Sequence, residues 1–196
     1  SDLHGNLPLI EEVACIYCIS GDIMPLNIQS NDRKCRKWLR EDFIPWANNL
    51  PCAHVILVAG NHDFVFYRME KPDIDKIFEG SKVIYLENSG VQLEGLNIFG
   101  TPWCHQFGRW AFMADDDKLA DLFSEIPDNV DILITHDAPY GTSDICFQKV
   151  YWNYGDHIGC VPLRDAILAK KPKLVLHGHL HSTNHESEVL GDSDVY

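Results

Sequence analysis

The chain has 196 residues, a length that suits one domain with a continuous hydrophobic core. Hydrophobic residues make up 45% of it, and no apolar run approaches the roughly 20 residues of a membrane-spanning helix, so we expect no membrane partner. The formal net charge of -13 argues against a general nucleic-acid binder, but it does not exclude a phosphate ester, because bound cations can invert the local potential.

Apolar, β-branched runs along the chain predict strands at 15–20, 54–59, 82–86, 91–99, 130–135 and 173–177. The stretch Leu93-Glu-Gly-Leu-Asn-Ile is typical of a hairpin, because Gly95 and Asn97 supply turn residues between alternating segments.

Helical periodicity begins near Ser30 or Asn31, and Pro45 is expected to end or kink this first helix. Its apolar face carries Cys35, Trp38, Leu39 and Phe43. Two further helices are marked by Leu119, Leu122, Phe123 and Ile126, and by Leu163, Ile167 and Leu168. Strands that alternate with helices, together with one hairpin, predict a mixed sheet or two sheets flanked by helices.

Two long loops, 101–114 and 137–160, are rich in aromatic residues. Loops of this length in a compact domain are usually functional, although most of the aromatic side chains are expected to pack a satellite core. The aromatic residues are Trp103, Phe107, Trp110 and Phe112 in the first loop, and Tyr140, Phe147, Tyr151, Trp152 and Tyr154 in the second.

Ligand-type side chains stand immediately after four of the predicted strands. They are Asp22, then Asn61, His62 and Asp63, then His136, and finally His177, His179 and His181. In open α/β sheets the carboxyl ends of strands converge on one crevice where ligands bind, so these side chains should cluster there.

Aspartate offers a charged oxygen that can bridge two cations, and imidazole favours transition metals over calcium or magnesium. In a regular strand His179 and His181 would share one face. A turn just past the strand end is therefore needed if each is to reach a different ion.

Five motifs follow one another in the chain: Asp-Leu-His-Gly from Asp2, Gly-Asp, Gly-Asn-His-Asp, Thr-His and Gly-His-Leu-His. This order resembles the calcineurin-like metallophosphoesterase superfamily, whose motifs are DxH, GDxx, GNH(D/E), (G/T)H and GHxH. A narrower resemblance, carried by 100–103, 135–141, 159–160 and 177–181, is to the small branch of metallophosphoesterase-domain-containing phosphodiesterases.

The resemblance implies a four-layer αββα sandwich of two mixed β-sheets flanked by helices, with two divalent ions (Mn, Fe or Zn) at one edge. It implies that Asp2, His4 and His181 bind the first ion, that Asp22 bridges both, and that Asn61, His136 and His179 bind the second. His62 would be the catalytic histidine that protonates the leaving oxygen, and Asp63 would orient it.

The activity implied is a dinuclear metal-dependent phosphodiesterase, in which a metal-bridging hydroxide attacks a small diester such as a cyclic nucleotide. Two alternatives stay open: a phosphomonoesterase or protein phosphatase with the same metal core, and a non-catalytic scaffold. In the protein-phosphatase branch the second motif reads GDxxDRG, whereas here Gly21-Asp-Ile-Met-Pro-Leu-Asn has neither the acid nor the arginine. This departure favours the diesterase.

Arg109 and His105, both in the first aromatic loop, are candidates for contacts with the substrate, and His177 is a candidate neighbour of a metal ligand. The remaining histidines, His54, His157 and His185, are expected to be structural or at the surface. Asp115-Asp-Asp is interpreted as the acidic start of a helix rather than as a third metal site.

Seven cysteines form an odd set without the spacings of a disulfide framework, and reduced thiols fit the cytoplasmic location that we expect. The chain begins at Ser1 directly on a ligand motif and stops at Tyr196 in mid-pattern. We therefore expect a single domain over 1–196 that lacks a few residues at both ends. The sequence leaves the oligomeric state and the presence of a signal segment before Ser1 open.

Overall fold

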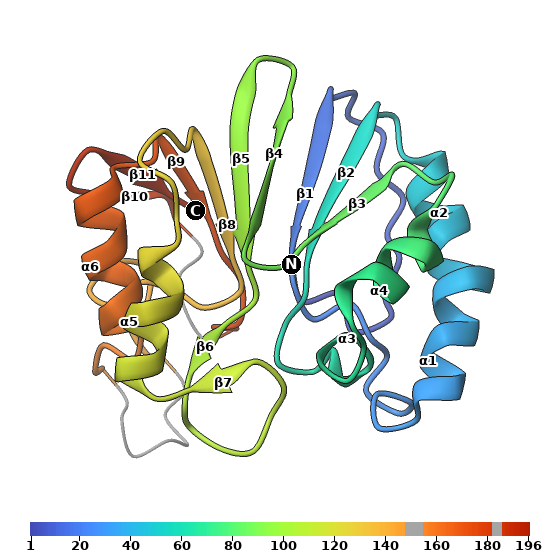
Figure 1. Ribbon diagram of the computed structural model, residues 1–196, viewed down its shortest axis with the longest axis horizontal. Coiled ribbons are helices and arrows are strands. Elements are labelled where there is room, and N and C mark those ends of the chain that lie inside the picture. Colours follow the sequence, from blue (N-terminus) through green and yellow to red (C-terminus); the bar gives the residue numbers. More distant parts are fainter. Residues whose placement is uncertain (148–154, 182–185) are drawn as a thin grey trace.

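The computed structural model describes residues 1–147, 155–181 and 186–196 and shows two β-sheets between outer layers of helices (Figure 1). The smaller sheet has the strand order β1-β2-β3, and its strands are parallel throughout. They are β1 (Ile16–Ser20), β2 (His54–Val58) and β3 (Val83–Leu86). The expected αββα layering is confirmed, except that this sheet is parallel rather than mixed.

The larger sheet is mixed and has the order β10-β11-β9-β8-β5-β4. Its central pairs β5–β8, β8–β9 and β9–β11 are parallel, and the two edge pairs are antiparallel. The strands are β4 (Ser89–Leu93), β5 (Leu96–Thr101), β8 (Ile132–Thr135), β9 (Leu174–Leu176), β10 (Glu188–Leu190) and β11 (Ser193–Val195). A separate short parallel ribbon pairs β6 (Cys104–His105) with β7 (Met113–Ala114).

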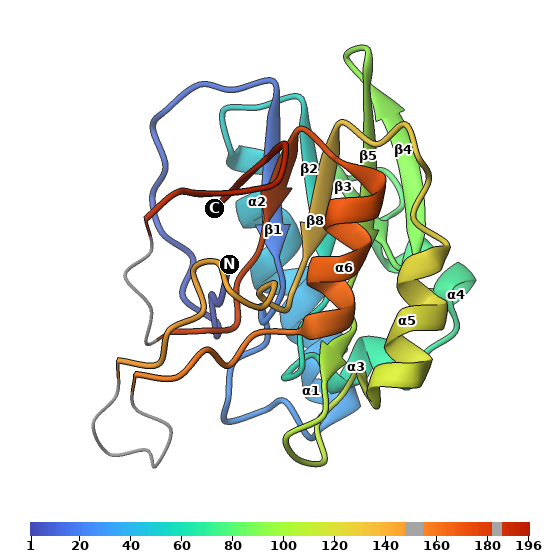
Figure 2. The ribbon, with the colours of Figure 1, turned by 90° about the vertical axis from the view of Figure 1, so that its left-hand side faces the viewer.

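Helices cover the outer face of each sheet. Beside the smaller sheet lie α1 (Asp32–Trp38), η1 (Leu39–Phe43), α2 (Ile44–Asn49), α3 (Phe64–Tyr67) and α4 (Lys71–Phe78). Helices α5 (Asp116–Ser124) and α6 (Val161–Lys170) lie side by side on the outer face of the larger sheet (Figure 2). In the described part of the chain, none of the helices has the length and apolar character needed to cross a bilayer.

Three apolar clusters hold the four layers together. One joins the smaller sheet to its helices through residues such as Leu57 and Phe43, and another joins the larger sheet to α5 and α6. The third lies between the sheets and contains Ile56, Val58, Leu86, Ile98 and Ile134. Gly100 permits this close approach, because a Cβ there would stand 2.6 Å from Cβ of Leu86.

The first predicted helix does not end at Pro45. Asn31 caps its start, with its side-chain oxygen accepting the N–H of Lys34 at 3.1 Å. Leu39–Phe43 then adopt a wider π-helical turn, and α2 continues from Ile44. Proline lacks an N–H and crowds the carbonyl four residues earlier in a regular helix, and the wide turn places Pro45 in the first turn of α2, where an N–H is not required.

The hairpin is confirmed, but its turn is formed by Glu94 and Gly95, whose φ angles are 50° and 80°. Asn97, expected in the turn, lies in β5 opposite Gln92. The remaining predicted strands agree with the structure to within a few residues. The short strands β6, β7, β10 and β11 and the helices α3 and α4 were not predicted.

Candidate metal centre

The predicted ligands follow the carboxyl ends of strands in both sheets. Asp22 comes two residues after β1, Asn61 three after β2, His136 directly after β8 and His179 three after β9. Asp22 and His179 have φ angles of 54° and 70°, so the backbone turns sharply as it leaves each sheet. The turn expected between the strand and the two last histidines is therefore present.

Asp22, His136 and Asn61 form the buried centre of the cluster. His136 is fully buried, and its Nδ1 donates to the carbonyl oxygen of Ser20 at 2.8 Å. Its Nε2 therefore faces the cluster, 2.9 Å from Oδ1 of Asn61 and 3.5 Å from Oδ2 of Asp22. His4 approaches the same carboxylate, with its Nε2 at 3.9 Å from Oδ2 of Asp22.

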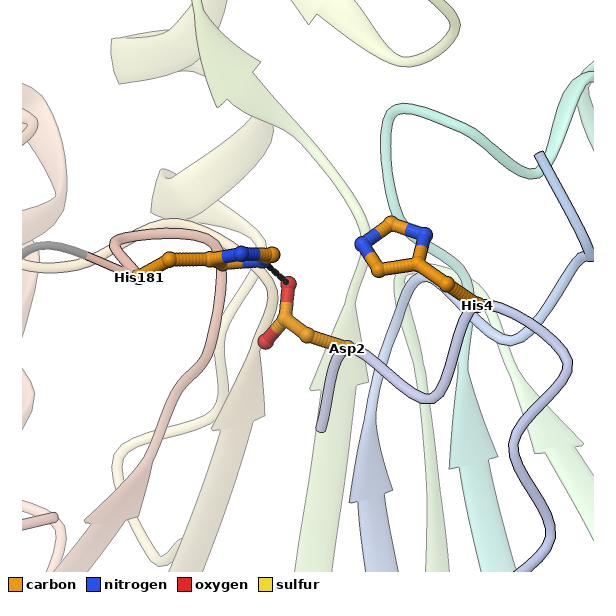
Figure 3. A group of neighbouring side chains, drawn as sticks. All are labelled: Asp2, His4 and His181. Atoms are coloured by element: carbon orange, nitrogen blue, oxygen red, sulfur yellow. Dashed lines mark hydrogen bonds and ion pairs between the residues drawn. The ribbon is translucent and has the colours of Figure 1, made fainter.

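The N-terminal segment brings Asp2 and His4 to this centre by backbone pairing. The N–H of Asp2 donates to Gly21, and the N–H of His4 donates to Asp22, each at 2.9 Å. Figure 3 shows the carboxylate of Asp2 between the rings of His181 and His4, with Nε2 of His181 at 3.1 Å from Oδ1 of Asp2. The N–H of His179 also donates to the Asp2 carboxylate, at 3.0 Å.

The charges of these groups are strongly coupled. Burial alone disfavours the charged form of His136, but the carboxylate of Asp22 outweighs it and raises the pKa of His136 to about 9. Burial likewise opposes ionisation of Asp22 and Asp2, yet attraction to His136 leaves the pKa of each carboxyl below its ordinary value. Burial, together with repulsion from His136, lowers the pKa of His179 to about 4, so this ring is neutral at neutral pH.

The donor set fits metal ions. Two groups, Asp2 with His4 and His181, and Asp2 with Asp22 and His136, have ligand atoms that lie within 4.8 Å of one another. Among the described residues, the buried Nδ1 of His4 has no hydrogen-bond partner. Gly60 leaves room for the centre, since a Cβ there would stand 2.2 Å from Oδ1 of Asp22. Mixed nitrogen and oxygen ligation is typical of manganese, iron or zinc.

His62 lies at the edge of this cluster. Its backbone N–H donates to Oδ1 of Asp22 at 2.7 Å, and its Nε2 lies 3.9 Å from Oδ2 of the same carboxylate. The ring is partly exposed. Burial lowers its pKa, although the charge of Asp22 acts in the opposite direction.

The prediction that Asp63 orients His62 is wrong. Asp63 is fully buried, and its carboxylate accepts the backbone N–H groups of Gly60, Met24 and Ile23 at 2.8, 2.9 and 3.3 Å. The side chain therefore points into the protein, away from the ring that follows Asn61. Nδ1 of His62 lies instead 2.7 Å from Oε1 of Gln29, a residue that sequence reasoning missed. Gln29 stands in an irregular loop, where no spacing indicates a partner.

The first aromatic loop borders the cluster on the solvent side. His105 is held by the buried Asp137, whose Oδ2 accepts both the backbone N–H and Nδ1 of His105 at 2.8 Å. The ring of Phe107 lies 5.1 Å from that of His179, and the ring of Trp110 lies 4.6 Å from that of His62. Phe107 and Trp110 remain 52% and 37% exposed.

Asp137 was not predicted, although its place directly after the ligand-type His136 is a signal that could have found it. Trp103 and Phe112, in contrast, pack in the core as expected. Arg109 is exposed on the same loop and makes no ion pair with any other described residue. His105 and Arg109 stay predictions as substrate contacts.

Of the other described histidines, His177 lies beside the cluster, and His54 and His157 lie elsewhere. His177 follows β9 and is mostly buried, with its Nε2 unpartnered among the described residues. His54 begins β2, and Nδ1 of His157 pairs with the buried Asp144 at 2.5 Å. Asp115 caps α5 through the N–H of Lys118, which confirms the helix start. Four residues discussed above lie outside the described residues: Tyr151, Trp152, Tyr154 and His185.

Comparisons with known proteins agree with this geometry. A family model described as "Calcineurin-like phosphoesterase" matches residues 1–183. The human and mouse proteins named "Metallophosphoesterase domain-containing protein 1" are each 28% identical over 204 residues, which covers 92% of this chain and 59% of theirs. The chain thus spans about three fifths of the length of these relatives.

Solved structures share the fold at low sequence identity. One superposes with a TM-score of 0.66 and 14% identity, over 92% of this chain and 77% of that chain. The protein TT1561 of Thermus thermophilus superposes with a TM-score of 0.55 and 16% identity, over 93% and 75%. With the family model covering nearly all residues and the five motifs converging on one cluster, the chain belongs to the calcineurin-like phosphoesterase family.

Proposed function

We propose that this chain is a dinuclear metal-dependent phosphodiesterase that hydrolyses a small phosphodiester, such as a cyclic nucleotide. The observation that carries the proposal is the convergence of ligand-type side chains from both sheets on Asp22, with Nε2 of His62 beside them at 3.9 Å. Asp22 would bridge the two ions, because His4 and His136 approach its Oδ2 at 3.9 and 3.5 Å. The first ion would be held by Asp2, His4 and His181, and the second by Asn61, His136 and His179.

Two bound cations would supply Lewis acidity toward the phosphoryl oxygens and a water molecule of lowered pKa. The protein's own residues perform the remaining tasks. The oxygen of water adds to phosphorus, the P–O bond to one alcohol breaks, and its electron pair stays on the alcohol oxygen. That oxygen takes a proton from Nε2 of His62, and the proton that water loses passes to solvent. General acids of this kind contribute about 10²- to 10⁴-fold to the rate.

Charge supports a diester over a monoester as the substrate. A phosphomonoester carries up to two negative charges, whereas a diester carries one. In the described part of the chain, the ion pairs of Asp2 and Asp22 involve histidines only, with no lysine or arginine. The exposed rings of Phe107 and Trp110 beside the cluster offer an apolar surface to the second ester group. All seven cysteines are free, which supports a cytoplasmic location.

Parallel assays on bis-p-nitrophenyl phosphate and p-nitrophenyl phosphate, with the purified chain loaded with Mn²⁺, Fe²⁺ or Zn²⁺, test this proposal. We expect turnover of the diester to exceed that of the monoester. Asp22→Ala should abolish both metal binding and hydrolysis. Turnover of the monoester alone would point to a phosphatase, and full activity of Asp22→Ala would refute the metal-bridging role.

A further inference from the structure

The ring of His62 is held in one orientation by groups on three sides. The His4 ring meets it edge-on, with centroids 5.1 Å apart, and the Trp110 ring lies 4.6 Å away. On the side away from the cluster, Nδ1 lies 2.7 Å from Oε1 of Gln29. A carbonyl oxygen can only accept, so Nδ1 must carry the hydrogen. The ring atom left for the substrate is Nε2, which faces Asp22.

Gln29 is itself fixed by the loop that carries it. The backbone N–H groups of Ile28 and Gln29 both donate to the carbonyl of Pro25, at 3.0 and 3.1 Å. The N–H of Asn31 donates to Ile28 at 2.8 Å, and Asn31 caps α1. The half-buried Gln29 thus lies between a closed turn and a helix start, and these backbone hydrogen bonds fix the position from which its side chain reaches His62.

We infer that Gln29 is a positioning residue, whose side-chain carbonyl accepts Nδ1–H of His62 and aims Nε2 at the leaving oxygen of the ester. In the proton-donating imidazolium form both ring nitrogens carry a hydrogen, so Nδ1–H stays on Gln29 while Nε2–H faces the ester. This inference rests on the proposed function, in which His62 is the proton donor. An uncharged amide here takes the place that sequence reasoning gave to the carboxylate of Asp63. The interaction orients the ring without adding negative charge beside the phosphate, which would repel an anionic substrate.

The kinetic test uses Gln29→Met, which keeps the length of the side chain but removes the acceptor, and Gln29→Glu, which keeps an acceptor. The substrates are methyl phenyl phosphate and methyl p-nitrophenyl phosphate, which differ only in how much their leaving oxygen needs a proton. We expect Gln29→Met to lower kcat about 10- to 100-fold on the phenyl ester, with KM little changed. The loss should be smaller on the p-nitrophenyl ester, and Gln29→Glu should restore part of the rate.

Two controls separate positioning from a general loss of structure. Gln92→Met makes the same change on the exposed side of β4, far from the cluster, and should leave both rates unaltered. In a His62→Ala background, Gln29→Met should have no further effect, because the ring that Gln29 positions is gone. An equal loss in that background, or an equal loss on both esters, would overturn the inference.

A spectroscopic readout keeps the inference testable even if no diester is turned over, in which case the proposed function fails by itself. Long-range ¹H–¹⁵N correlation spectra of the metal-free chain, at a pH where the ring is neutral, report which nitrogen of His62 carries the hydrogen. We expect Nδ1–H in the wild type and a shift toward Nε2–H in Gln29→Met. The same tautomer in both proteins would refute the role of Gln29.

Discussion

The carboxylate of Asp63 accepts the backbone N–H of Met24 at 2.9 Å, joining two segments that lie 39 residues apart. Its other oxygen accepts Gly60 at 2.8 Å and Ile23 at 3.3 Å. Asp63 therefore ties the turn after β2, which carries Asn61, to the turn after β1, which carries Asp22. Asp63 thus acts on the spacing of the proposed metal ligands rather than on His62.

Replacement of Asp63 by Asn should destabilise the fold. The amide keeps one acceptor oxygen but turns its NH₂ group toward buried N–H donors, which then lose their partner. We expect the free energy of unfolding to fall by about 2–4 kcal/mol. Urea denaturation measures it, with Asp73→Asn on the surface of α4 as the control, because the exposed pair of Asp73 with Lys76 is screened by solvent and contributes little to stability. Equal stability of Asp63→Asn and the wild type would contradict this role.

Gly60→Ala should disable the metal centre. An added Cβ would meet Oδ1 of Asp22 at 2.2 Å and its backbone nitrogen at 2.5 Å, so the ligand must move. We expect metal affinity, measured by isothermal titration calorimetry, to fall at least about 10-fold. Gly90→Ala in β4 serves as the control, because its nearest neighbour, the Ile98 oxygen, would be 3.1 Å from the new Cβ. Unchanged metal affinity in Gly60→Ala would contradict this prediction, because it would show that the site can accommodate the added methyl group.

The metal-free protein should lose stability as the pH rises. The pKa of His136 is raised from 6.5 to about 9, since attraction to Asp22 outweighs the effect of burial. The protonated ring therefore stabilises the folded chain fully below pH 6.5, and this contribution is lost as the pH rises through 9. Urea denaturation in chelator across this range should show the decline, and His136→Gln should show less of it. Metal affinity should rise over the same range, because a ligand imidazole must be neutral.

The exposed rings of the first aromatic loop should bind the second ester group. Phe107→Ala is expected to raise KM for bis-p-nitrophenyl phosphate about 3- to 10-fold, because a stacked aromatic pair is worth roughly 0.5–1.5 kcal/mol. KM for methyl p-nitrophenyl phosphate should change less, since a methyl group gains little from the ring. Leu9→Ala, which removes an apolar side chain that is 87% exposed, is the control. Equal changes for both esters would assign Phe107 a purely structural role.

Much of the fold and of the cluster was predictable because both depend on local patterns. Apolar runs locate β1, β2, β8 and β9, and the ligand-type residues that follow them must meet at strand ends. The positions of Asp22 and His136 could be predicted without knowing the path of any long loop, because both residues follow a strand within two positions. The π-helical turn before Pro45 was not predictable in this way, because it arises from how one proline is accommodated in a helix that packing keeps intact.

The surroundings of His62 were not predictable because they depend on where loops lie in space. Gln29 and His62 are 33 residues apart, and no periodicity links them. Asp63 stands next to His62 in the sequence, which favoured a contact between them. The short turn at the start of α3 instead directs the carboxylate inward, where it accepts three backbone N–H groups. Adjacency along the chain is a poor guide wherever the backbone turns sharply.

The hydrogen bond from His179 to Asp2 joins residues 177 positions apart, so the candidate ligands come from the first and the last parts of the chain. During synthesis, Asp2, His4 and Asp22 leave the ribosome early, whereas His179 and His181 emerge after all three strands of the smaller sheet and four of the six strands of the larger one. A growing chain can therefore hold a cation only through a partial and weak set of ligands. Tight capture of metal thus becomes possible only after His179 and His181 have been synthesised.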